Sequence, residues 1–544
     1  MKPPAPDRNL PAEVEVFDTT LRDGTQREGI SYSLEDKLRI AQKLDLLGVM
    51  FIEGGWPGSN PKDAEFFAQV RELKLNTAKI VAFGATRRAK LAPADDPSVR
   101  ALVDAGTEVC AIFGKSSPLQ VKEVLRSTLE ENLAMIEETV AYLRSQGKRV
   151  IYDAEHFFDG FDADRFYALE TLRAAMRGGA ETLVLCDTNG GHLPWQVEEA
   201  VRVVSCHFGA TVRIGIHAHD DTGCGVANTV AAVRGGAAHI QGTINGYGER
   251  CGNANLCIAI PALELKLGVR ALPKGKLPHL RDVARFVAEV ANLAPDDHMA
   301  YVGNSAFAHK AGVHVAAQQR APEAYQHIDP TLVGNASRVV VSELSGRANV
   351  LAKAEEFGFA GLDAQAGIRV VEEIKLLEHA GFSFEAAEAS VALMVRRQAA
   401  DYVAPFSLVD YRVMVGRHAD KRFAEATIKL QSGKDELHTA ASGDGPVHAF
   451  DRALRKALEP IFPRVHEMHL ADYKVRILNG SAGTGAITRV LIDWHYTGEG
   501  TTTAPRWSTV GAGTNILEAT WLALADGYEF GLTTAPATPK EISA

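Results

Sequence analysis

The sequence predicts an α/β protein that begins with a (β/α)8 TIM barrel, continues through helical linker subdomains and ends in a C-terminal α+β domain of two repeated units. Three observations support this prediction. Short apolar runs alternate with amphipathic stretches from residue 14 to about residue 270, polar residues follow most of these runs, and a short pattern recurs near the C-terminus. A chain of 544 residues also exceeds the roughly 250–300 residues at which a single hydrophobic core stops growing.

Eight apolar runs have the length and composition of buried parallel strands. The stretches between them have the period of amphipathic helices, for example at residues 34–47, 120–144 and 195–207. The alternation therefore predicts eight strand-helix units in about 250 residues. The predicted strands span residues 14–18, 49–53, 79–83, 108–113, 149–153, 182–186, 212–216 and 239–244.

An open doubly wound sheet would give a similar order of elements, so the position of the polar residues decides between the two folds. Barrel enzymes place their catalytic residues at the C-terminal ends of the strands. Candidate residues follow six of the predicted strands, which favours a closed barrel with one active-site mouth. They are Asp23, Glu53, Glu155, Asp187 with Thr188, His217 with His219, and Glu249 with Asn253.

The chain after the barrel falls into further segments. We expect the barrel domain to cover residues 1–275 and helical linker subdomains to cover 276–402, because helical periodicity continues to about residue 400. A third domain is expected at 403–535. Residues 536–544 are expected to form a flexible tail.

An internal repeat predicts the organisation of the third domain. The pattern Leu-Val-Asp-Tyr-Arg-Val beginning at Leu408 recurs as Leu-Ala-Asp-Tyr-Lys-Val beginning at Leu470. Each copy continues through strand-like runs and a glycine-containing turn to an apolar helix, at 447–458 and 515–525. We infer two related β-rich units of similar size.

Composition limits the classes of function. The net charge of −10 and the absence of a dense Lys/Arg cluster argue against a nucleic-acid partner. No apolar run approaches the ~20 residues that span a bilayer, and the N-terminal residues lack the apolar core of a secretory signal. We therefore expect a cytoplasmic protein without a membrane partner. Six cysteines without a Cys-x-x-Cys pair are expected to be reduced thiols.

A candidate metal site combines residues from three strand ends. His217 and His219 are two residues apart on one strand, so they share a face with Cα atoms about 6.6 Å apart. Barrel closure would bring Asp23 to the same mouth, and Asn253 could add an amide oxygen. Such a mixed nitrogen and oxygen set suits Mn²⁺, Mg²⁺, Zn²⁺ or Fe²⁺.

An open cation at a barrel mouth can chelate and polarise a 2-oxo acid. Arg22 could contact the same substrate oxygens, or could form a salt bridge across the mouth. Thr188 could donate its hydroxyl to a substrate carboxylate, or could cap the following helix. The residue types leave both pairs of alternatives open.

Four separated motifs resemble the family of 2-isopropylmalate, homocitrate and citramalate synthases. Further stretches beginning at Leu34, Ile52, Asp153 and Val341 look most like the citramalate branch of that family. The four motifs are Asp-Thr-Thr-Leu-Arg-Asp-Gly-Thr-Gln from Asp18, His-Ala-His-Asp-Asp from His217, Gly-Glu-Arg-Cys-Gly-Asn-Ala from Gly248 and Phe-Ala-His-Lys-Ala-Gly-Val-His from Phe307.

The resemblance implies an acyltransferase that performs a Claisen-type condensation of acetyl-CoA with a 2-oxo acid, followed by thioester hydrolysis. For the citramalate branch the oxo acid would be pyruvate and the product an isoleucine precursor. The family pattern makes Asp23, His217, His219 and Asn253 metal ligands. It makes Arg22, Gln26 and Thr188 substrate contacts, and Glu155 a catalytic residue.

The resemblance also implies that catalysis is shared between two subunits. His314 and Tyr325 match a histidine and a tyrosine that the family contributes from the post-barrel region to the partner's active site. We therefore expect a homodimer with swapped active-site elements. The domain at 403–535 resembles the allosteric dimerisation domain of 2-isopropylmalate synthase, which implies feedback inhibition by isoleucine.

Three other functions remain in view. One is a synthase acting on a different oxo acid, as in 2-isopropylmalate or homocitrate synthase. Another is a metal-dependent lyase of the 3-hydroxy-3-methylglutaryl-CoA type, which the Gly-Glu-Arg-Cys-Gly sequence around Cys251 and the doubled C-terminal domain oppose. The last is a non-catalytic amino-acid sensor, which the intact set of candidate site residues opposes.

Overall fold

The computed structural model describes residues 10–209, 211–309, 317, 321, 324–340, 350, 364–418, 421–497 and 506–534. The chain divides into two compact units, one of Met1–Phe307 with Gln326–Ser337 and one of Ala308–Tyr325 with Arg338–Ala544. The segment expected at 276–402 contributes to both units, and the predicted tail at 536–544 lies outside the described residues. Among the helices that can be described, none is long and apolar enough to cross a membrane.

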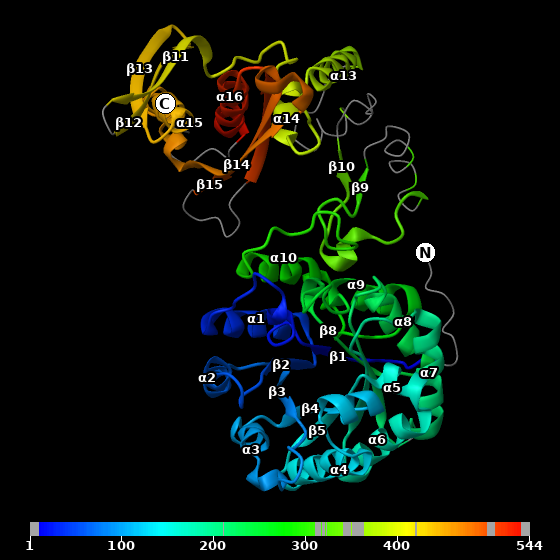
Figure 1. The fold of residues 1–544 in the computed structure, drawn as a ribbon. Helices are drawn as coiled ribbons and strands as arrows, with labels where there is room; N and C mark the ends of the chain where they lie inside the picture. Colours follow the sequence, from blue (N-terminus) through cyan, green and yellow to red (C-terminus); the bar gives the residue numbers. More distant parts are fainter. Residues whose placement is uncertain are drawn as a thin grey trace. The chain divides into compact units, whose positions relative to one another are not determined.

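The first unit contains a closed barrel of eight parallel strands, and the predicted fold is confirmed (Figure 1). The strands follow each other around the barrel in sequence order, and pairing of β1 with β8 closes it, with Phe17 opposite Gln241. Each predicted strand overlaps an observed one. The strands are β1 (Glu15–Asp18), β2 (Phe51–Gly55), β3 (Lys79–Ala85), β4 (Val109–Lys115), β5 (Arg149–Glu155), β6 (Thr182–Asp187), β7 (Arg213–Ala218) and β8 (His239–Gly242).

Helices surround the barrel (Figure 1). The first of them shows how the sequence sets their limits, because Ser33 and Asp36 form a reciprocal capping box and Gly48 ends the helix with a φ of 90°. The helices of this unit are α1 (Leu34–Leu47), α2 (Pro61–Val70), α3 (Pro97–Asp104), α4 (Leu129–Ser145), α5 (Phe157–Ala163), α6 (Arg165–Gly178), α7 (Pro194–Phe208), α8 (Gly225–Gly235), α9 (Leu256–Ala262) and α10 (Leu280–Val290).

The helix predicted at 120–144 is broken in the structure. A short π-helical turn at Gln120–Val124 ends, Arg126 adopts a positive φ of 52°, and α4 begins after Thr128. The Thr128 side chain accepts a hydrogen bond from the backbone N–H of Glu131. Apolar periodicity continues across the break, so it predicted one helix, whereas the capping threonine starts a new one.

The barrel interior below the mouth is filled by apolar side chains from the strands. Phe17, Phe51 and Val184 are fully or almost fully buried there and belong to a cluster that continues to Phe83 near the mouth. Burial of such side chains stabilises the fold by about 1.5–3 kcal/mol each. The strand ends above this cluster are therefore held in fixed positions, on which the site is built.

The second unit contains two sheets of three antiparallel strands, each followed by a helix, which confirms the predicted repeat. The register shifts at the same point of both copies, between Leu408 and Asp410 and between Leu470 and Asp472. The first copy is β11 (Ser407–His418), β12 (Lys421–Ser432), β13 (Asp435–Gly443) and α15 (Pro446–Leu458). The second is β14 (Met468–Ile477), β15 (Thr488–Tyr496), β16 (Arg506–Gly513) and α16 (Ile516–Thr534).

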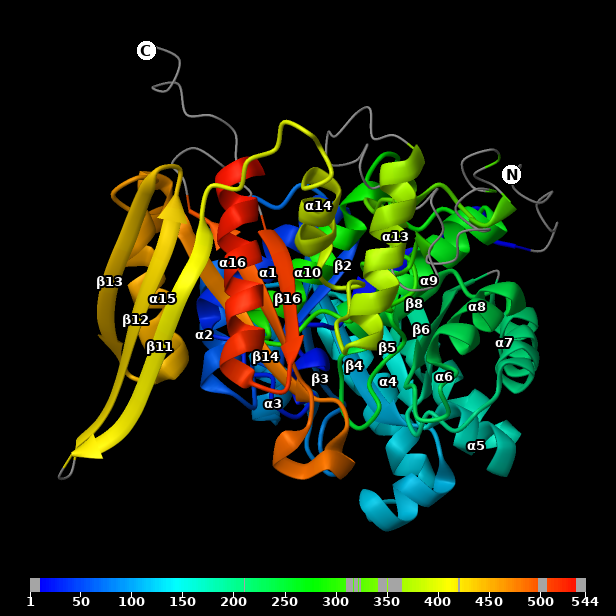
Figure 2. The ribbon, with the colours of Figure 1, turned by 90° about the horizontal axis from the view of Figure 1, so that it is seen from above.

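In each copy of the repeat, the helix covers its own sheet (Figure 2). Trp494 of β15 stacks on Trp507 of β16, with ring centroids 6.1 Å apart. Gly527 of α16 is required at this contact, because a Cβ there would lie 2.2 Å from Trp494. The other elements of this unit are β9 (Ala308–His309), β10 (Arg338–Val339), α13 (Ala364–His379) and α14 (Glu388–Arg396).

Candidate active site at the barrel mouth

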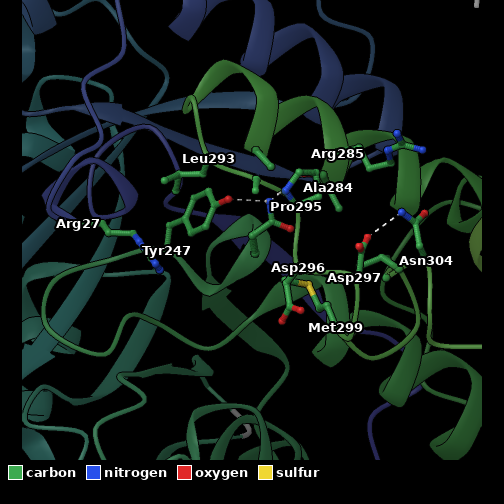
Figure 3. A pocket seen from close by; sticks show the side chains of 15 residues that line it. Arg27, Tyr247, Ala284, Arg285, Leu293, Pro295, Asp296, Asp297, Met299 and Asn304 are labelled. Atoms are coloured by element: carbon green, nitrogen blue, oxygen red, sulfur yellow. Dashed lines mark hydrogen bonds between the residues drawn. The ribbon is translucent and has the colours of Figure 1, made fainter. Parts of the chain in front are cut away.

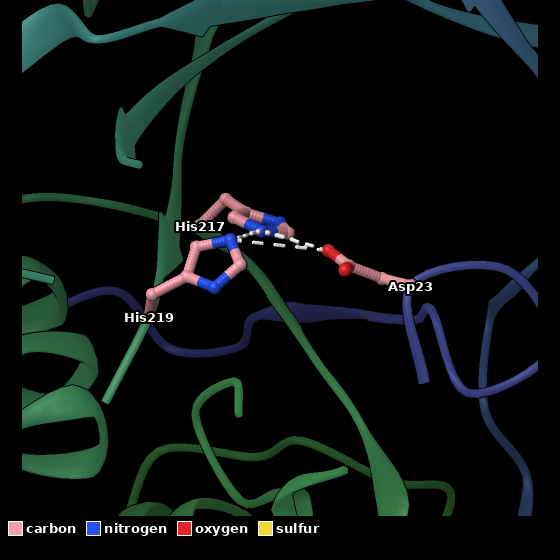
Figure 4. A group of neighbouring side chains, drawn as sticks. All are labelled: Asp23, His217 and His219. Carbon is pink, nitrogen blue, oxygen red and sulfur yellow. Dashed lines mark hydrogen bonds and ion pairs between the residues drawn. The ribbon is translucent and has the colours of Figure 1, made fainter. Parts of the chain in front are cut away.

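Asp23, His217 and His219 lie together at the C-terminal mouth of the barrel, as the sequence predicted (Figure 4). Asp23 follows β1, His217 lies near the end of β7 and His219 follows it. His217 Nε2 is 3.3 Å from His219 Nε2 and 3.4 Å from Asp23 Oδ2, and His219 Nε2 is 4.0 Å from the same oxygen. Ligand atoms that share one cation at about 2.1 Å lie at comparable separations.

The electrostatics of Asp23 and His219 favour the forms that bind a cation. At His217 burial acts to lower the pKa, but the neighbouring Asp23 carboxylate outweighs it and raises the pKa above its usual value. All three residues are buried. Burial alone would raise the pKa of Asp23, but Arg22 and the two histidines hold it far below its usual value. Burial and the nearby His217 lower the pKa of His219 to about 4, so its imidazole is neutral at neutral pH. An ionised carboxylate and a neutral imidazole are the required ligand states.

Asn253 also lies in the cluster, but its Nδ2 faces the other ligands. That nitrogen is 3.0 Å from Asp23 Oδ2 and 3.4 Å from His217 Nε2. Ligation through the amide oxygen would require the side-chain amide to turn by 180°. Asp23 Oδ1 and Asn253 Oδ1 are both buried and accept no hydrogen bond, so two acceptor oxygens remain for a cation or its water ligands.

Arg22 forms a buried ion pair and lines the same cavity. Its Nε donates to Glu53 Oε2 at 2.6 Å, and its guanidinium carbon lies 3.8 Å from the centroid of the Phe83 ring. The salt-bridge alternative of the sequence analysis is therefore observed, and it holds the guanidinium in place beside Asp23. The two roles are compatible, because Glu53 holds the Nε atom while Arg22 also lines the cavity.

Thr188, Gln26 and Glu155 line the cavity with the metal-site residues. Thr188 Oγ1 accepts a hydrogen bond from the backbone N–H of His156 at 2.8 Å, which leaves its hydroxyl hydrogen available to donate. Thr188 does not cap a helix, since α7 begins at Pro194. Glu155, at the end of β5, forms an ion pair with Lys115 at the end of β4.

The cavity has a volume of about 250 Å³ and an aromatic wall that the sequence analysis did not identify. Phe83 and Phe113 stack with ring centroids 5.5 Å apart, and Trp56 meets both edge-on at 5.8 and 5.7 Å. Phe83 and Phe113 were the last residues of two predicted strands, and that position was the available signal. The wall and the polar groups line the same cavity, so a bound molecule would contact both apolar and polar surface.

Two more buried residues, Gln241 and Asp153, and one arginine, Arg250, lie around the candidate metal site and its cavity. Gln241 of β8 bridges His217 and Asp153, with 2.8 Å between His217 Nδ1 and Gln241 Oε1 and 3.0 Å between Gln241 Nε2 and Asp153 Oδ1. Burial raises the pKa of Asp153 to about 7. Arg250 lines the cavity and donates to both carboxylate oxygens of Asp221. None of these contacts follows from a motif.

The two candidates from the post-barrel region, His314 and Tyr325, are not among the described residues that line this cavity. His314 lies outside the described residues. Tyr325 belongs to the second unit, where its side chain is exposed and its ring lies 6.5 Å from that of His309. Their assignment to an active site remains a prediction.

A second cavity of about 250 Å³ opens beside the barrel loops (Figure 3). Arg27, which follows Gln26 in the chain, lines it from the β1 side, and its guanidinium lies 5.2 Å from the ring of Tyr247. Arg285 of α10 lines it from the other side, and Leu293, Pro295 and Met299 give it apolar surface. Adjacent residues of one loop thus line the two cavities.

Family models match most of the chain. Residues 13–287 match the HMGL-like family, residues 301–381 match the homocitrate synthase post-HMGL domain-like family, and residues 385–532 match the LeuA allosteric (dimerisation) domain. The first match covers the barrel and the metal-site candidates. The last covers both copies of the C-terminal repeat.

Curated relatives match over nearly the full length. An (R)-citramalate synthase of Geobacter sulfurreducens is 51% identical over 523 residues, covering 95% of this chain and 97% of that protein. An (R)-citramalate synthase of Synechocystis is 52% identical over 534 residues, covering 95% and 96%. Among solved structures, the HMG-CoA lyase of Bacillus subtilis is 21% identical with a TM-score of 0.46, covering 53% of this chain and 96% of that one.

Proposed function

Because this chain belongs to the family of (R)-citramalate synthases, we propose that it condenses acetyl-CoA with pyruvate and water to give (R)-citramalate and CoA. The observation that carries the proposal is the buried Asp23, His217 and His219 cluster at the mouth of a barrel whose chain matches such an enzyme over 95% of its length. The lyase alternative is not favoured, because these relatives share the C-terminal domain as well.

In this proposal Asp23, His217 and His219 hold a divalent cation, Mn²⁺, Mg²⁺ or Zn²⁺, and Asn253 joins them when its amide is turned. Such an ion, when bound, acts as a Lewis acid toward the oxo acid. The support is the separation of the ligand atoms, which all lie within 4.8 Å of one another, together with the two buried oxygens that accept no hydrogen bond.

The substrate contacts follow from the groups around the cavity. Arg22, held by Glu53, directs positive charge at the pyruvate oxygens as the keto oxygen becomes an alkoxide. Thr188 donates its free hydroxyl hydrogen to the carboxylate, and Gln26 contacts it from the β1 loop. The methyl group of pyruvate then faces the wall of Trp56, Phe83 and Phe113. This wall favours a small oxo acid, since a pocket discriminates by about 1–3 kcal/mol for each methylene.

The reaction needs several proton transfers, which groups of the chain must assist. A base removes a proton from the acetyl methyl group, the resulting carbanion forms the C–C bond with the keto carbon as the C=O π bond opens, and the alkoxide so formed takes up a proton. Water then adds to the thioester carbonyl, the C–S bond breaks, and the thiol leaves with a proton. Glu155 takes part in these proton transfers at the mouth of the barrel, where its carboxylate forms an ion pair with Lys115. His314 and Tyr325 of a partner subunit complete the site in a homodimer.

The C-terminal repeat serves regulation in this proposal, with isoleucine as the feedback inhibitor. The support is the match to an allosteric dimerisation domain over residues 385–532. We retain the proposed limits of 1–275 for the catalytic barrel, 276–402 for the linker subdomains and 403–535 for the regulatory domain.

Release of CoA from acetyl-CoA with a panel of oxo acids tests the proposal. We expect the highest kcat/KM with pyruvate, and a loss of about 100-fold or more in His217→Ala because a metal ligand is removed. His207→Ala, which removes an exposed histidine of α7, is the matched control and should retain activity. Preference for 2-oxoisovalerate or 2-oxoglutarate would overturn the assignment to pyruvate.

A further inference from the structure

Gln241 connects the candidate metal site to a buried carboxylate across the barrel interior. It lies on β8, directly opposite His217 on β7, and its side chain is fully buried. Its Oε1 is 2.8 Å from His217 Nδ1, and its Nε2 donates to Asp153 Oδ1 of β5 at 3.0 Å. One chain of hydrogen bonds thus joins β7, β8 and β5 beneath the mouth of the barrel.

The direction of these hydrogen bonds selects one tautomer of His217. An amide oxygen can only accept, so His217 Nδ1 must carry the hydrogen that lies between it and Gln241 Oε1. The neutral ring then has its lone pair on Nε2. That nitrogen is the one that faces Asp23 Oδ2 and His219 Nε2.

Asp153 explains why the amide of Gln241 keeps this orientation. Turning the amide by 180° would place its NH2 group against His217 Nδ1 and its oxygen against the Asp153 carboxylate. The carboxylate oxygen accepts the Nε2 hydrogen in the observed orientation and would face another acceptor in the turned one. Both residues are shielded from water, so no solvent molecule offers an easy replacement partner.

We propose that Gln241 is a positioning residue that presents the Nε2 lone pair of His217 to the divalent cation. The inference rests on the proposed metal site, and it assigns a role to a residue that no motif marks. Groups that hydrogen-bond a metal-ligating histidine fix its ring and typically contribute about 10–100-fold to metal affinity. Gln241 therefore acts through His217 and does not touch the substrate.

Metal affinity measures this role directly. The dissociation constant of Mn²⁺ is determined on the metal-free full-length protein from the electron paramagnetic resonance signal of free Mn²⁺. Gln241→Met keeps the length and volume of the side chain but removes the amide, and we expect Mn²⁺ to bind about 10–100-fold more weakly. Gln241→Glu keeps an acceptor for His217 Nδ1, and one proton shared between the new carboxyl group and Asp153 replaces the lost amide hydrogen. We therefore expect its Mn²⁺ affinity to be within a few-fold of the original.

The controls separate this role from general destabilisation. Asn335→Leu removes another buried amide, which donates to the carbonyls of Tyr301 and Gly303, and it should leave Mn²⁺ affinity unchanged. Equal Mn²⁺ affinity of folded Gln241→Met and the original protein would overturn the proposal. A Gln241→Glu protein that binds as weakly as His217→Ala would also overturn it, and this variant decides the question if Gln241→Met does not fold.

The same titrations distinguish failure of the inference from failure of the metal site. If the original protein and His217→Ala bind Mn²⁺ equally, the site itself is wrong, and Gln241 has no ligand to position. If His217→Ala loses Mn²⁺ binding and Gln241→Met binds Mn²⁺ as tightly as the original protein, the site stands and the positioning role falls.

Discussion

Phe113 belongs to the aromatic wall of the cavity, which we expect to limit the size of the substrate. Its ring stacks on Phe83, and Trp56 packs against both edge-on, so the three side chains limit the space in the cavity that Arg22 and Asp23 also line. Aromatic rings in this arrangement support each other, and a change in one ring opens space that the other two do not fill. The size of the accepted oxo acid is therefore expected to depend on this wall.

Replacing Phe113 by leucine should shift selectivity toward a larger oxo acid. We expect the ratio of kcat/KM for 2-oxobutyrate to that for pyruvate to rise about tenfold or more, because one added methylene then fits the enlarged cavity. Steady-state CoA release with both oxo acids measures the ratio. Phe51→Leu is the matched control, since Phe51 belongs to the same interior cluster but does not line the cavity. An unchanged ratio in Phe113→Leu would show that the wall does not set substrate size.

Single residues of the site differ in how far the sequence predicts them. Asp23 and His219 follow strands and His217 lies near the end of one, and a barrel brings strand ends together whatever its exact register, so pattern alone placed them. Gln241 and Phe113 lie within strands, and strand register and barrel closure decide which side chain each one meets. The bridge from His217 through Gln241 to Asp153 joins strands far apart in sequence, and no local signal encodes it.

At the scale of elements, the loop after β1, the loop after β8 and helix α10 enclose the second cavity. Gln26 lines the first cavity and Arg27 the second, so the two cavities lie on either side of one loop. In the proposed reaction the acetyl group and pyruvate occupy the first cavity, so the rest of acetyl-CoA would extend out of it. The second cavity offers apolar surface from Leu293 and Met299 and two arginines at its walls.

We expect Arg27→Ala and Arg285→Ala each to raise KM for acetyl-CoA about three- to tenfold, because each removes one exposed cation from the path of an anionic substrate. With acetyl-N-acetylcysteamine, which lacks the nucleotide, neither change should affect KM. Arg39→Ala is the control, because Arg39 of α1 packs over Phe286 of α10 and does not line the cavity. Equal effects on the long and the truncated thioester would argue against a subsite here.

Elements were predicted well where local sequence decides them. Helix α1 begins and ends at the predicted residues, because a capping box and a terminal glycine are both readable in the sequence. The helix at 120–144 was predicted as one element because apolar spacing does not reveal a positive φ at Arg126. The cap at Thr128 was visible as a residue type, but a threonine inside an amphipathic run carries little weight by itself.

The whole molecule combines a catalytic barrel with a duplicated C-terminal unit. The repeat was readable because both copies keep the same short pattern, and the structure gives both the same register shift two residues before the conserved tyrosine, Tyr411 or Tyr473. Association of two chains is different, because a single sequence does not state which surfaces of two copies meet. The shared active site proposed for His314 and Tyr325 depends on that association.

Mixing two inactive variants tests whether subunits share active sites. Asp23→Ala removes a proposed metal ligand from its own barrel, and His314→Ala leaves its barrel intact but cannot serve a partner. If sites are shared, half of the randomly exchanged dimers are mixed and each has one complete site, so activity should recover to about a quarter of the original. CoA release after subunit exchange, verified by native mass spectrometry of differently tagged chains, gives the answer.

A second mixture, of a doubly substituted chain with the original chain, tests the sharing of active sites through loss of activity instead of recovery. A chain that carries both Asp23→Ala and His314→Ala should inactivate both sites of a dimer with an original subunit, one through its missing ligand and the other through its missing histidine. An equal mixture should then retain about a quarter of the activity, from the original homodimers alone. Retention of about half, together with no recovery in the first mixture, would mean that each chain builds its own site and that His314 acts within its own subunit.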